Sequence, residues 1–430
     1  MHSRFRWPAV ALAAAVAVSA TAVAMSPTWL TTVKRITAEV SLRSGSDIAL
    51  IMGGTGMPDP THAYIDEVND FFLQPNFPGY EPLGLQTPEE AFPIYGLLSG
   101  YASVALGVDD LNTAITQTYA GDNLVIFGVS QSAMITSLEE QQLAANPPAD
   151  LGQLHFAMLA GPDNPMGGLF ERFAGLDNPV VNYDLYPPAP TDLFPTDMYT
   201  GEYDGVSDFP DDLSNLLSVA NAIAGMQYVH LGYDDLTMEQ VQSAVLLGQS
   251  GQTDFYMIPT TVLPILQPLY SSGESGKEMA DLLQPDLQVI VNMGYGNLEH
   301  GLVADPGGID GAVGVGFFDK VDPLAVEAAL QLGQVQGIVD ATDDYLSSQG
   351  QAPLPDSVTT LLDSTSGYDF TSWLDGQFIS GLTELSTLPG NADLNPAVLF
   401  DGLPLISGTS FIDSVNQYLT EVYTQLMGSL

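Results

Sequence analysis

Apolar runs of strand length alternate with segments of helical periodicity through the first part of the chain. The runs at 47–52, 124–127 and 154–159 are short and rich in aliphatic residues, and 197–203 continues the series. Between the first two runs, the segment 102–119 carries apolar residues at helical spacing. Short apolar runs are typical of buried strands, and their alternation with helices indicates a mostly parallel sheet flanked by helices. We therefore predict an α/β fold.

The pattern changes after residue 305. Residues 306–316 are rich in glycine, which is typical of a linker. The segment 321–347 has a helical pattern, and 410–427 gathers its apolar residues on one helical face. We predict that residues 306–430 form a helical C-terminal extension of a domain that spans 46–305.

The first residues have the layout of an export signal. Residues 4–25 begin with two arginines and continue as an apolar stretch, in which a small-x-small site ends at Ala24. Cleavage after Ala24 and retention as a membrane anchor both remain open, because the stretch is close to the about 20 residues that span a bilayer. In either case we predict that 1–24 directs export to the cell envelope or the exterior, and that 25–45 is a linker.

The 430-residue chain is strongly acidic, with a formal net charge of −44. Five of its eight Lys and Arg residues lie at or before Arg43, so the remainder of the chain carries very few cations. An anionic surface repels phosphates, which excludes nucleic acid as a partner and favours uncharged substrates. The chain has no cysteine, so it has no disulfide and no thiolate metal site. We predict neither a metal nor a cofactor.

The residues around Ser130 follow the order of a nucleophile elbow. The apolar run at 124–127 leads through Gly128 to Ser130, and 131–145 has a helical pattern. Such a strand–turn–helix exposes the serine oxygen to a substrate, and small residues must flank the serine because strand and helix approach closely. Ser132 stands where the G-x-S-x-G motif has its second glycine. The alternative is an ordinary strand-to-helix turn with a polar residue.

A glycine-rich loop at 53–58 directly follows the first predicted strand. In a serine hydrolase, the N–H of Gly54 or Thr55 in this loop and the N–H of Gln131 would form the oxyanion hole. The loop has neither the G-K-[ST] nor the G-x-G-x-x-G pattern of phosphate-binding loops. A plain glycine turn is the alternative.

A serine nucleophile needs a base, and histidine accepts a proton near neutral pH. His230 is the best candidate, because it follows a predicted helix at 211–224 and completes the chain order serine, carboxylate, histidine. The other histidines are His2 in the export segment, His62 before the serine, His155 inside a predicted strand and His300 in a later loop.

Asp204 is the best candidate for the acid. It directly follows the strand candidate at 197–203, and a rigidly held carboxylate can fix the tautomer of the imidazole. Asp208 is the rival, although its loop position suits hydrogen bonds to local backbone N–H groups and a cap on the following helix. Asp234 and Asp235 are weaker alternatives because they follow the histidine.

Several motifs together resemble a known family. The Gly-Val-Ser-Gln-Ser-Ala stretch at 128–133 is similar to the Gly-Tyr-Ser-Gln-Gly-Ala elbow of cutinases. A longer ordered set resembles the PE-PPE domain of actinobacterial, chiefly mycobacterial, proteins over roughly residues 47–305. The set comprises Gly-Gly-Thr-Gly-Met-Pro at 53–58, Gly-Val-Ser-Gln-Ser at 128–132, Pro-Met-Gly-Gly at 165–168, Tyr-Asp-Gly-Val-Ser-Asp-Phe-Pro at 203–210 and Leu-Leu-Gln-Pro-Asp-Leu at 282–287.

The resemblance implies an α/β-hydrolase of the cutinase-like kind, whose members act as esterases or as acyltransferases that build envelope lipids. It implies Ser130 as the nucleophile, Asp204 as the acid and His230 as the base, with Gln131 in the oxyanion hole. The PE-PPE pattern shares the serine at position 132.

Two hypotheses for function follow. The first is an exported hydrolase that forms an acyl-enzyme on Ser130 from lipid or simple esters. Water as acceptor would make it an esterase, and a sugar hydroxyl such as that of trehalose would make it an acyltransferase. The second is a non-catalytic acidic envelope protein that binds cations or a partner. The apolar segment 255–266 either lines an acyl-chain site or is plain core.

Overall fold

A computed structural model describes residues 45–148, 151–173, 186–298, 301 and 321–354. The strands are β1 (Asp47–Ile51), β2 (Glu81–Gly84), β3 (Asn123–Val129), β4 (Leu154–Leu159), β5 (Thr196–Gly201), β6 (Val245–Ser250) and β7 (Thr253–Ile258). The α-helices are α2 (His62–Val68), α3 (Gly100–Thr113), α4 (Gln131–Ala145), α5 (Leu169–Arg172), α6 (Leu216–Tyr228), α7 (Met238–Gln242), α8 (Gln267–Tyr270), α9 (Glu274–Met293) and α10 (Pro323–Ser348). Short π-helices are η1 (Asn69–Leu73) and η2 (Ala114–Thr118), and short 3-10 helices are η3 (His230–Asp235) and η4 (Pro264–Leu266).

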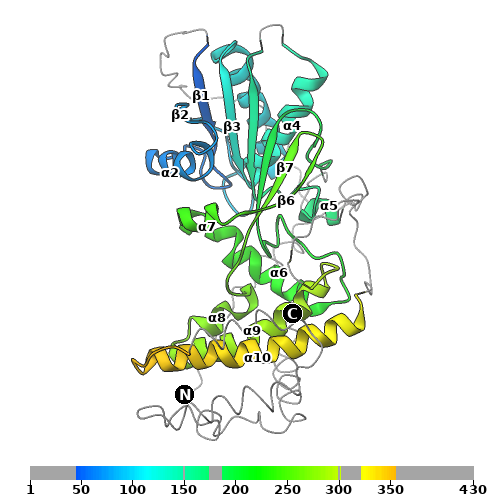
Figure 1. The fold of residues 1–430 in the computed structure, drawn as a ribbon. Coiled ribbons are helices and arrows are strands. Elements are labelled where there is room, and N and C mark those ends of the chain that lie inside the picture. The colour runs from blue at the N-terminus through cyan, green and yellow to red at the C-terminus, as the bar shows by residue number, and fades with distance from the viewer. Residues whose placement is uncertain (1–44, 149–150, 174–185, 299–300, 302–320, 355–430) are drawn as a thin grey trace, which may run out of the picture. The chain divides into compact units, whose positions relative to one another are not determined.

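The strands form one seven-stranded sheet in the order β2-β1-β3-β4-β5-β7-β6 (Figure 1). Every neighbouring pair is parallel except β6 and β7, which are antiparallel. The prediction of a mostly parallel sheet is therefore confirmed. Because β1 lies between β2 and β3, the chain changes direction across the sheet between β1 and β3. In open α/β sheets, ligands bind at the carboxyl ends of the strands at such a switch point.

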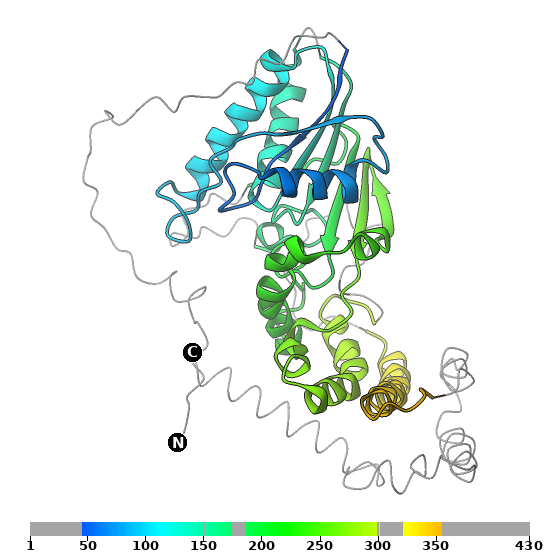
Figure 2. The same ribbon diagram turned by 90° about the vertical axis from the view of Figure 1, so that its left-hand side faces the viewer.

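Alternate residues of the strands supply two separate cores. Ile48 and Leu50 of β1 pack in the cluster that contains α3 and α4, whereas Ala49 and Ile51 pack in the cluster that contains α2, η1 and α7. This is the period of two expected of a strand that is buried on both faces. Figure 2 shows α3 and α4 on one side of the sheet and α2 on the other. The sheet is therefore the middle layer of three.

The two outer strands, β2 and β6, and the strand β7 beside β6 are not predicted from the sequence. The sequence of β2, Glu-Pro-Leu-Gly, contains a proline and only one aliphatic residue, which is compatible with an edge strand but gives no strand signal. The predicted strand 197–203 ends earlier, at Gly201, and Tyr203 beyond it has a φ of +64°, which lies outside the β region. The predicted helix 211–224 begins only at Leu216.

The structure divides into two compact units. The described residues of unit 1 are those between 45 and 211 and at 222–260, which include the whole sheet, and those of unit 2 are 212–221, 261–298, 301 and 321–354. The predicted boundary after residue 305 stays a prediction, because it falls between described segments. The predicted segments 1–24 and 410–427, and all of the predicted linker 25–45 except its last residue, lie outside the described residues.

In unit 2, helices α9 and α10 pack closely against each other. A Cβ atom added to Gly337 of α10 would lie 2.2 Å from the carbonyl oxygen of Leu282 in α9, so only glycine permits this approach. Lys277 of α9 forms an ion pair with Asp344 of α10. The helix predicted at 321–347 is thus confirmed as α10. Within the described residues, no helix has both the length and the hydropathy needed to cross a bilayer.

Unit 1 contains several buried carboxyl groups besides Asp204 and Asp208, the two candidates for the acid. Burial raises the pKa of Glu89 to about 8, that of Glu139 and of Glu171 to about 7, and that of Asp163 to about 6. A hydrogen bond from Asn112 Nδ2 to Glu139 Oε1 (2.8 Å) opposes the shift at Glu139 only in part. A carboxyl whose pKa is raised by folding binds its proton more tightly in the folded state than in the unfolded chain. The stability that it contributes is present below the unfolded pKa and is lost as pH rises through the folded pKa.

We therefore expect the melting temperature to fall as pH rises from 5 to 8. The variant Glu139→Gln keeps the acceptor for Asn112 but cannot ionise, so its melting temperature should fall less over the same range. Thermal melts monitored by circular dichroism at constant ionic strength measure the difference. Asp66→Asn, which removes an exposed carboxylate on α2, is the matched control and should keep the wild-type slope. Equal slopes for Glu139→Gln and the wild type would contradict the expectation.

Candidate active site

Ser130 lies in a sharp turn between β3 and α4. Its backbone has φ 54° and ψ −110°, which is unusual for a residue with a side chain. The N–H of Ser130 donates to the carbonyl of Leu159 at the end of β4 (2.9 Å), which anchors the turn to the sheet. Positive φ at a serine between a strand and a helix is the geometry of a nucleophile elbow, because it turns the hydroxyl away from both elements.

The residues that flank Ser130 make this turn possible. A Cβ atom on Gly128 would lie 2.4 Å from the carbonyl oxygen of Ser132 and 2.5 Å from Oγ1 of Thr136, so glycine is required there. Ser132 is fully buried, and its Oγ accepts from the N–H of Val129 (2.7 Å) and donates to the Val129 carbonyl (3.1 Å). The serine at the second glycine position of the motif therefore closes the turn with its hydroxyl.

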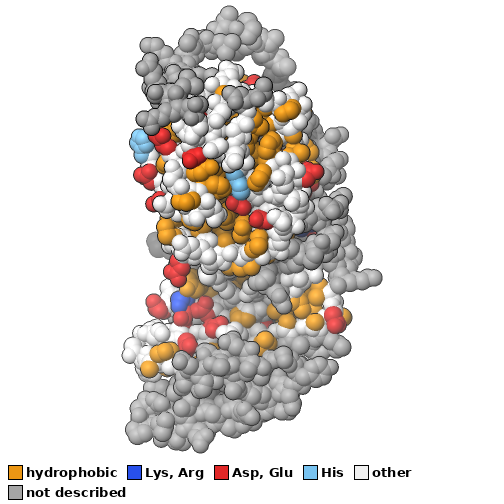
Figure 3. Space-filling view, turned by 45° about the horizontal axis from the view of Figure 1, so that its top comes forward, with side chains coloured by type: hydrophobic (Ala, Val, Ile, Leu, Met, Phe, Trp, Pro, Cys, Tyr) orange, Lys and Arg blue, Asp and Glu red, His pale blue; other side chains and the backbone are white. Residues whose placement is uncertain are grey.

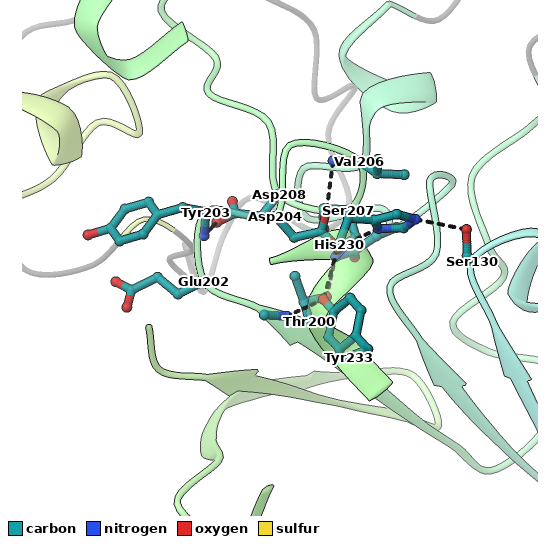
Figure 4. Close-up of polar contacts among 12 residues, drawn as sticks. Ser130, Thr200, Glu202, Tyr203, Asp204, Val206, Ser207, Asp208, His230 and Tyr233 are labelled. Atoms are coloured by element: carbon teal, nitrogen blue, oxygen red, sulfur yellow. Dashed lines mark hydrogen bonds and ion pairs between the residues drawn. The ribbon is translucent and has the colours of Figure 1, made fainter. Parts of the chain in front are cut away.

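His230 opens η3 and joins Ser130 to Asp204 (Figure 4). Its Nε2 lies 2.9 Å from Ser130 Oγ, and its Nδ1 lies 2.9 Å from Asp204 Oδ2. With the proton on Nδ1 donated to the carboxylate, Nε2 is free to accept the serine proton. The three residues predicted for the triad, which are 74 and 26 residues apart in sequence, are thus brought into one chain of hydrogen bonds.

Asp204 is fully buried and accepts four hydrogen bonds. The donors are His230 Nδ1 and the hydroxyls of Tyr233 and Ser207 (both 2.8 Å) to Oδ2, and the N–H of Val206 (2.9 Å) to Oδ1. Burial alone would raise the pKa of Asp204, but His230 and the hydrogen bonds outweigh it, so the pKa is lowered. The carboxylate is therefore ionised and fixed in orientation.

Tyr233 is a contributor that the sequence did not reveal. Its hydroxyl accepts from the N–H of Gly201 at the end of β5 (2.8 Å) and donates to Asp204. Burial, and then the charge of Asp204, raise the pKa of Tyr233 well above its usual value, so the phenol keeps its proton. The one available signal was its position three residues after His230, which places both side chains on one side of the 3-10 turn.

Asp208 does not reach the imidazole in the structure. It is fully buried, and its Oδ2 accepts from the N–H of Tyr203 (2.7 Å), the residue of positive φ just before Asp204. Burial raises the pKa of Asp208 well above its usual value. The expected bond to a local backbone N–H is thus present, but the side chain that caps the start of α6 is Asn215, whose Oδ1 accepts from the N–H of Ser218. Asp234 and Asp235 are exposed.

The predicted oxyanion-hole groups lie at the carboxyl ends of β1 and β3, the neighbours at the switch point. A Cβ atom on Gly54 would lie 3.7 Å from Cβ of Ser130, so this loop borders the serine. The N–H of Gly56 is taken by the carbonyl of Glu89 (2.8 Å), whereas the N–H groups of Gly54 and Thr55 have no acceptor among the described residues. Gln131 is the first residue of α4, where a helix leaves its N–H without an internal acceptor.

The other candidates from the sequence lie elsewhere. His62 is exposed at the start of α2, and His155 of β4 pairs with Asp197 of β5 (3.1 Å). His2 and His300 lie outside the described residues. In the segment 255–266, Phe255 and Met257 belong to β7 and pack in the core of the sheet.

The sequence of this chain is similar to those of known proteins. The PE-PPE domain matches residues 78–296. PPE28 of Mycobacterium tuberculosis, an uncharacterised PPE family protein, is 39% identical over 74% of this chain and 49% of its own length. Esterase PE16 of the same organism is 36% identical over 71% of this chain and 58% of its own length. Diacyltrehalose acyltransferase Chp2, also from that organism, is 27% identical over 42% of this chain and 54% of its own length.

This chain spans about half the length of PPE28, the first of these relatives. The matched range contains the elbow, the end of β5 and η3, and therefore Ser130, Asp204 and His230. The resemblance carried by the sequence motifs is confirmed, and the chain belongs to the PE-PPE domain family.

Proposed function

We propose that this chain is an exported serine hydrolase or acyltransferase that forms an acyl-enzyme on Ser130. The observation that carries the proposal is the hydrogen-bonded order Ser130 Oγ, His230, Asp204, with 2.9 Å at both links, at a serine of positive φ. The relatives support the reaction class, because they include an esterase and a diacyltrehalose acyltransferase.

In the first half-reaction Ser130 Oγ attacks the carbonyl carbon of an ester while His230 Nε2 takes the serine proton. The imidazolium that forms is stabilised by the ionised carboxylate of Asp204, which lies 2.9 Å from Nδ1. The negative charge on the former carbonyl oxygen is bound by the N–H of Gln131 together with that of Gly54 or Thr55. Collapse of this intermediate breaks the ester bond, and the leaving alcohol takes the proton from Nε2.

In the second half-reaction an acceptor hydroxyl attacks the acyl-serine, and His230 removes its proton and returns it to Ser130 Oγ. Water as acceptor releases a carboxylic acid, and a sugar hydroxyl gives a new ester. Both reactions use the same groups, so they differ only in which acceptor reaches the acyl-enzyme. The name of Chp2, a diacyltrehalose acyltransferase, makes a trehalose-type sugar our first candidate for the acceptor.

The substrate that we propose is an uncharged lipid or simple ester of the cell envelope. The net charge of −44 disfavours anionic substrates, and the surface in Figure 3 carries scattered acidic side chains and few basic ones. The export segment at 4–25 would deliver the catalytic domain, which we assign to residues 46–305, beyond the cytoplasmic membrane. The helical region 306–430 would be an extension of this domain.

We expect a fluorophosphonate probe to label the wild type and to leave Ser130→Ala unlabelled, because only an activated serine reacts with it. His230→Ala should lose nearly as much activity toward short p-nitrophenyl esters as Ser130→Ala, several orders of magnitude, since triad members act as a unit. His62→Ala, which removes an exposed histidine, is the matched control and should stay active. A folded Ser130→Ala variant with full activity would refute the assignment.

The roles of the two buried aspartates can be separated by Asp204→Asn and Asp208→Asn. Asp204→Asn should keep the geometry but lower turnover by about 10⁴, the cost of a wrong imidazole tautomer in a serine protease. Asp208→Asn keeps an oxygen that can accept from the N–H of Tyr203 and has no bond to the imidazole, so turnover should change little. Its effect should be on the free energy of unfolding, which should fall by about 1 kcal/mol. Turnover and melting temperature are measured for both. Loss of turnover in Asp208→Asn alone would invert the assignment.

Product analysis distinguishes hydrolysis from transfer. The purified full chain is incubated with an acyl donor ester, with and without trehalose, and the products are identified by mass spectrometry. If the enzyme is an acyltransferase, acyl-trehalose should form with trehalose present and free acid should be minor. If it is an esterase, free acid should form at the same rate in both reactions. Ser130→Ala should form neither product.

A further inference from the structure

A loop between β2 and α3 exposes an unusual set of apolar side chains. Residues 91–98, Ala-Phe-Pro-Ile-Tyr-Gly-Leu-Leu, contain no charged residue and neither serine nor threonine. We refer to them as the 91–98 loop. The exposed fractions are 57% for Phe92, 84% for Ile94, 44% for Tyr95 and 88% for Leu97. In Figure 2 the loop projects from unit 1 beside the start of α3. Soluble proteins rarely expose contiguous apolar groups of this size without a partner for them.

The 91–98 loop is held in this exposed state by its own hydrogen bonds. The backbones of Ala91 and Tyr95 bond each other in both directions (2.9 and 3.2 Å), and the N–H of Phe92 donates to the carbonyl of Leu98 (2.8 Å). The carboxylate of Glu90 accepts from the N–H groups of Leu97 and Leu98. Because the loop is already ordered, binding through its side chains costs little further conformational entropy.

The same loop is attached to the proposed oxyanion hole. Nε2 of Gln131, the residue after Ser130, donates to the carbonyl of Glu90 (3.0 Å). Ser103 Oγ accepts from the N–H of Glu90 (2.8 Å) and donates to Oε1 of Gln131 (3.0 Å). The ring of Tyr95 approaches Gly56 of the glycine-rich loop, because a Cβ atom there would lie 3.9 Å from the ring. The apolar loop is therefore part of the rim of the candidate active site.

We propose that the 91–98 loop docks this protein on an uncharged lipid surface, with Ile94 and Leu97 entering the apolar layer. The inference deepens the proposed function and rests on it for the orientation of Ser130 toward the lipid. Side chains that are more than four-fifths exposed cannot line a pocket around one acyl chain, but they suit the open apolar region of a lipid layer. The absence of charge in the loop and the net charge of −44 on the chain favour lipids without anionic head groups.

The natural lack of cysteine allows a site-specific test in the full chain. Leu97→Cys, in the inactive Ser130→Ala background, is labelled with an environment-sensitive nitrobenzoxadiazole probe and mixed with phosphatidylcholine vesicles. Probe emission should rise severalfold and shift to the blue as the loop enters the apolar layer. Leu246→Cys is the matched control, because Leu246 is 55% exposed on β6, at the opposite edge of the sheet from β2. Its probe should not respond.

Replacing half of the lipid by phosphatidylglycerol should weaken the response at low salt, because the chain is acidic. The proposal is overturned if the probe at 97 does not respond to phosphatidylcholine, if the probe at 246 responds equally, or if the response requires the anionic lipid. A response that appears without vesicles when protein concentration rises would identify an interface between copies of the chain and would also overturn it. Because Ser130 is absent from these variants, failure of the proposed chemistry leaves the readout unaffected.

Discussion

The ionised carboxylate of Asp204, held away from solvent, is the constraint on which the candidate site depends. Taking a carboxylate out of water costs several kcal/mol, and the folded state offsets this only by supplying donors in the right places. Here the donors come from η3, through His230 and Tyr233, and from the turn after β5, through Ser207 and Val206. One buried charge thus fixes two segments against the end of a strand, and the orientation of the imidazole follows from it.

A second constraint is steric and lies in the turn at Ser130. A non-glycine residue of this conformation costs about 1–3 kcal/mol and persists only where its surroundings leave no alternative. Those surroundings are the close approach at Gly128, the hydroxyl of Ser132 bonded to Val129, and the bond from Ser130 N–H to Leu159. The turn follows the end of β3, whose neighbour in the sheet is β1. The hydroxyl of Ser130 therefore lies at the switch point of the sheet, next to the glycine-rich loop.

The sequence was informative where one local pattern determines the outcome. Apolar runs identified β1, β3, β4 and most of β5, and the motif and chain order selected the three residues that the structure brings together. It was uninformative where a contact depends on folding of distant segments. The bond of the Tyr233 hydroxyl to Asp204 requires η3 to lie against the end of β5, and the link from Gln131 to Glu90 requires α4 to meet the loop before α3. The spacing of three residues between His230 and Tyr233 places them on one side of a turn but does not name Asp204 as the partner, and no spacing links Gln131 to Glu90.

The hydrogen bond from the side chain of Gln131 to the carbonyl of Glu90 connects the proposed oxyanion hole to the 91–98 loop. The N–H of Gln131 would bind the oxyanion, while its side chain holds the base of an apolar, uncharged loop. In a mechanism whose acceptor is either water or a sugar hydroxyl, the outcome depends on how much water reaches the acyl-serine. With the 91–98 loop inserted in lipid, water would be kept from one side of the site, and acyl chains would reach Ser130 from that same side. The balance between hydrolysis and transfer would then be governed by the surface on which the protein sits, because the catalytic groups are the same for both reactions.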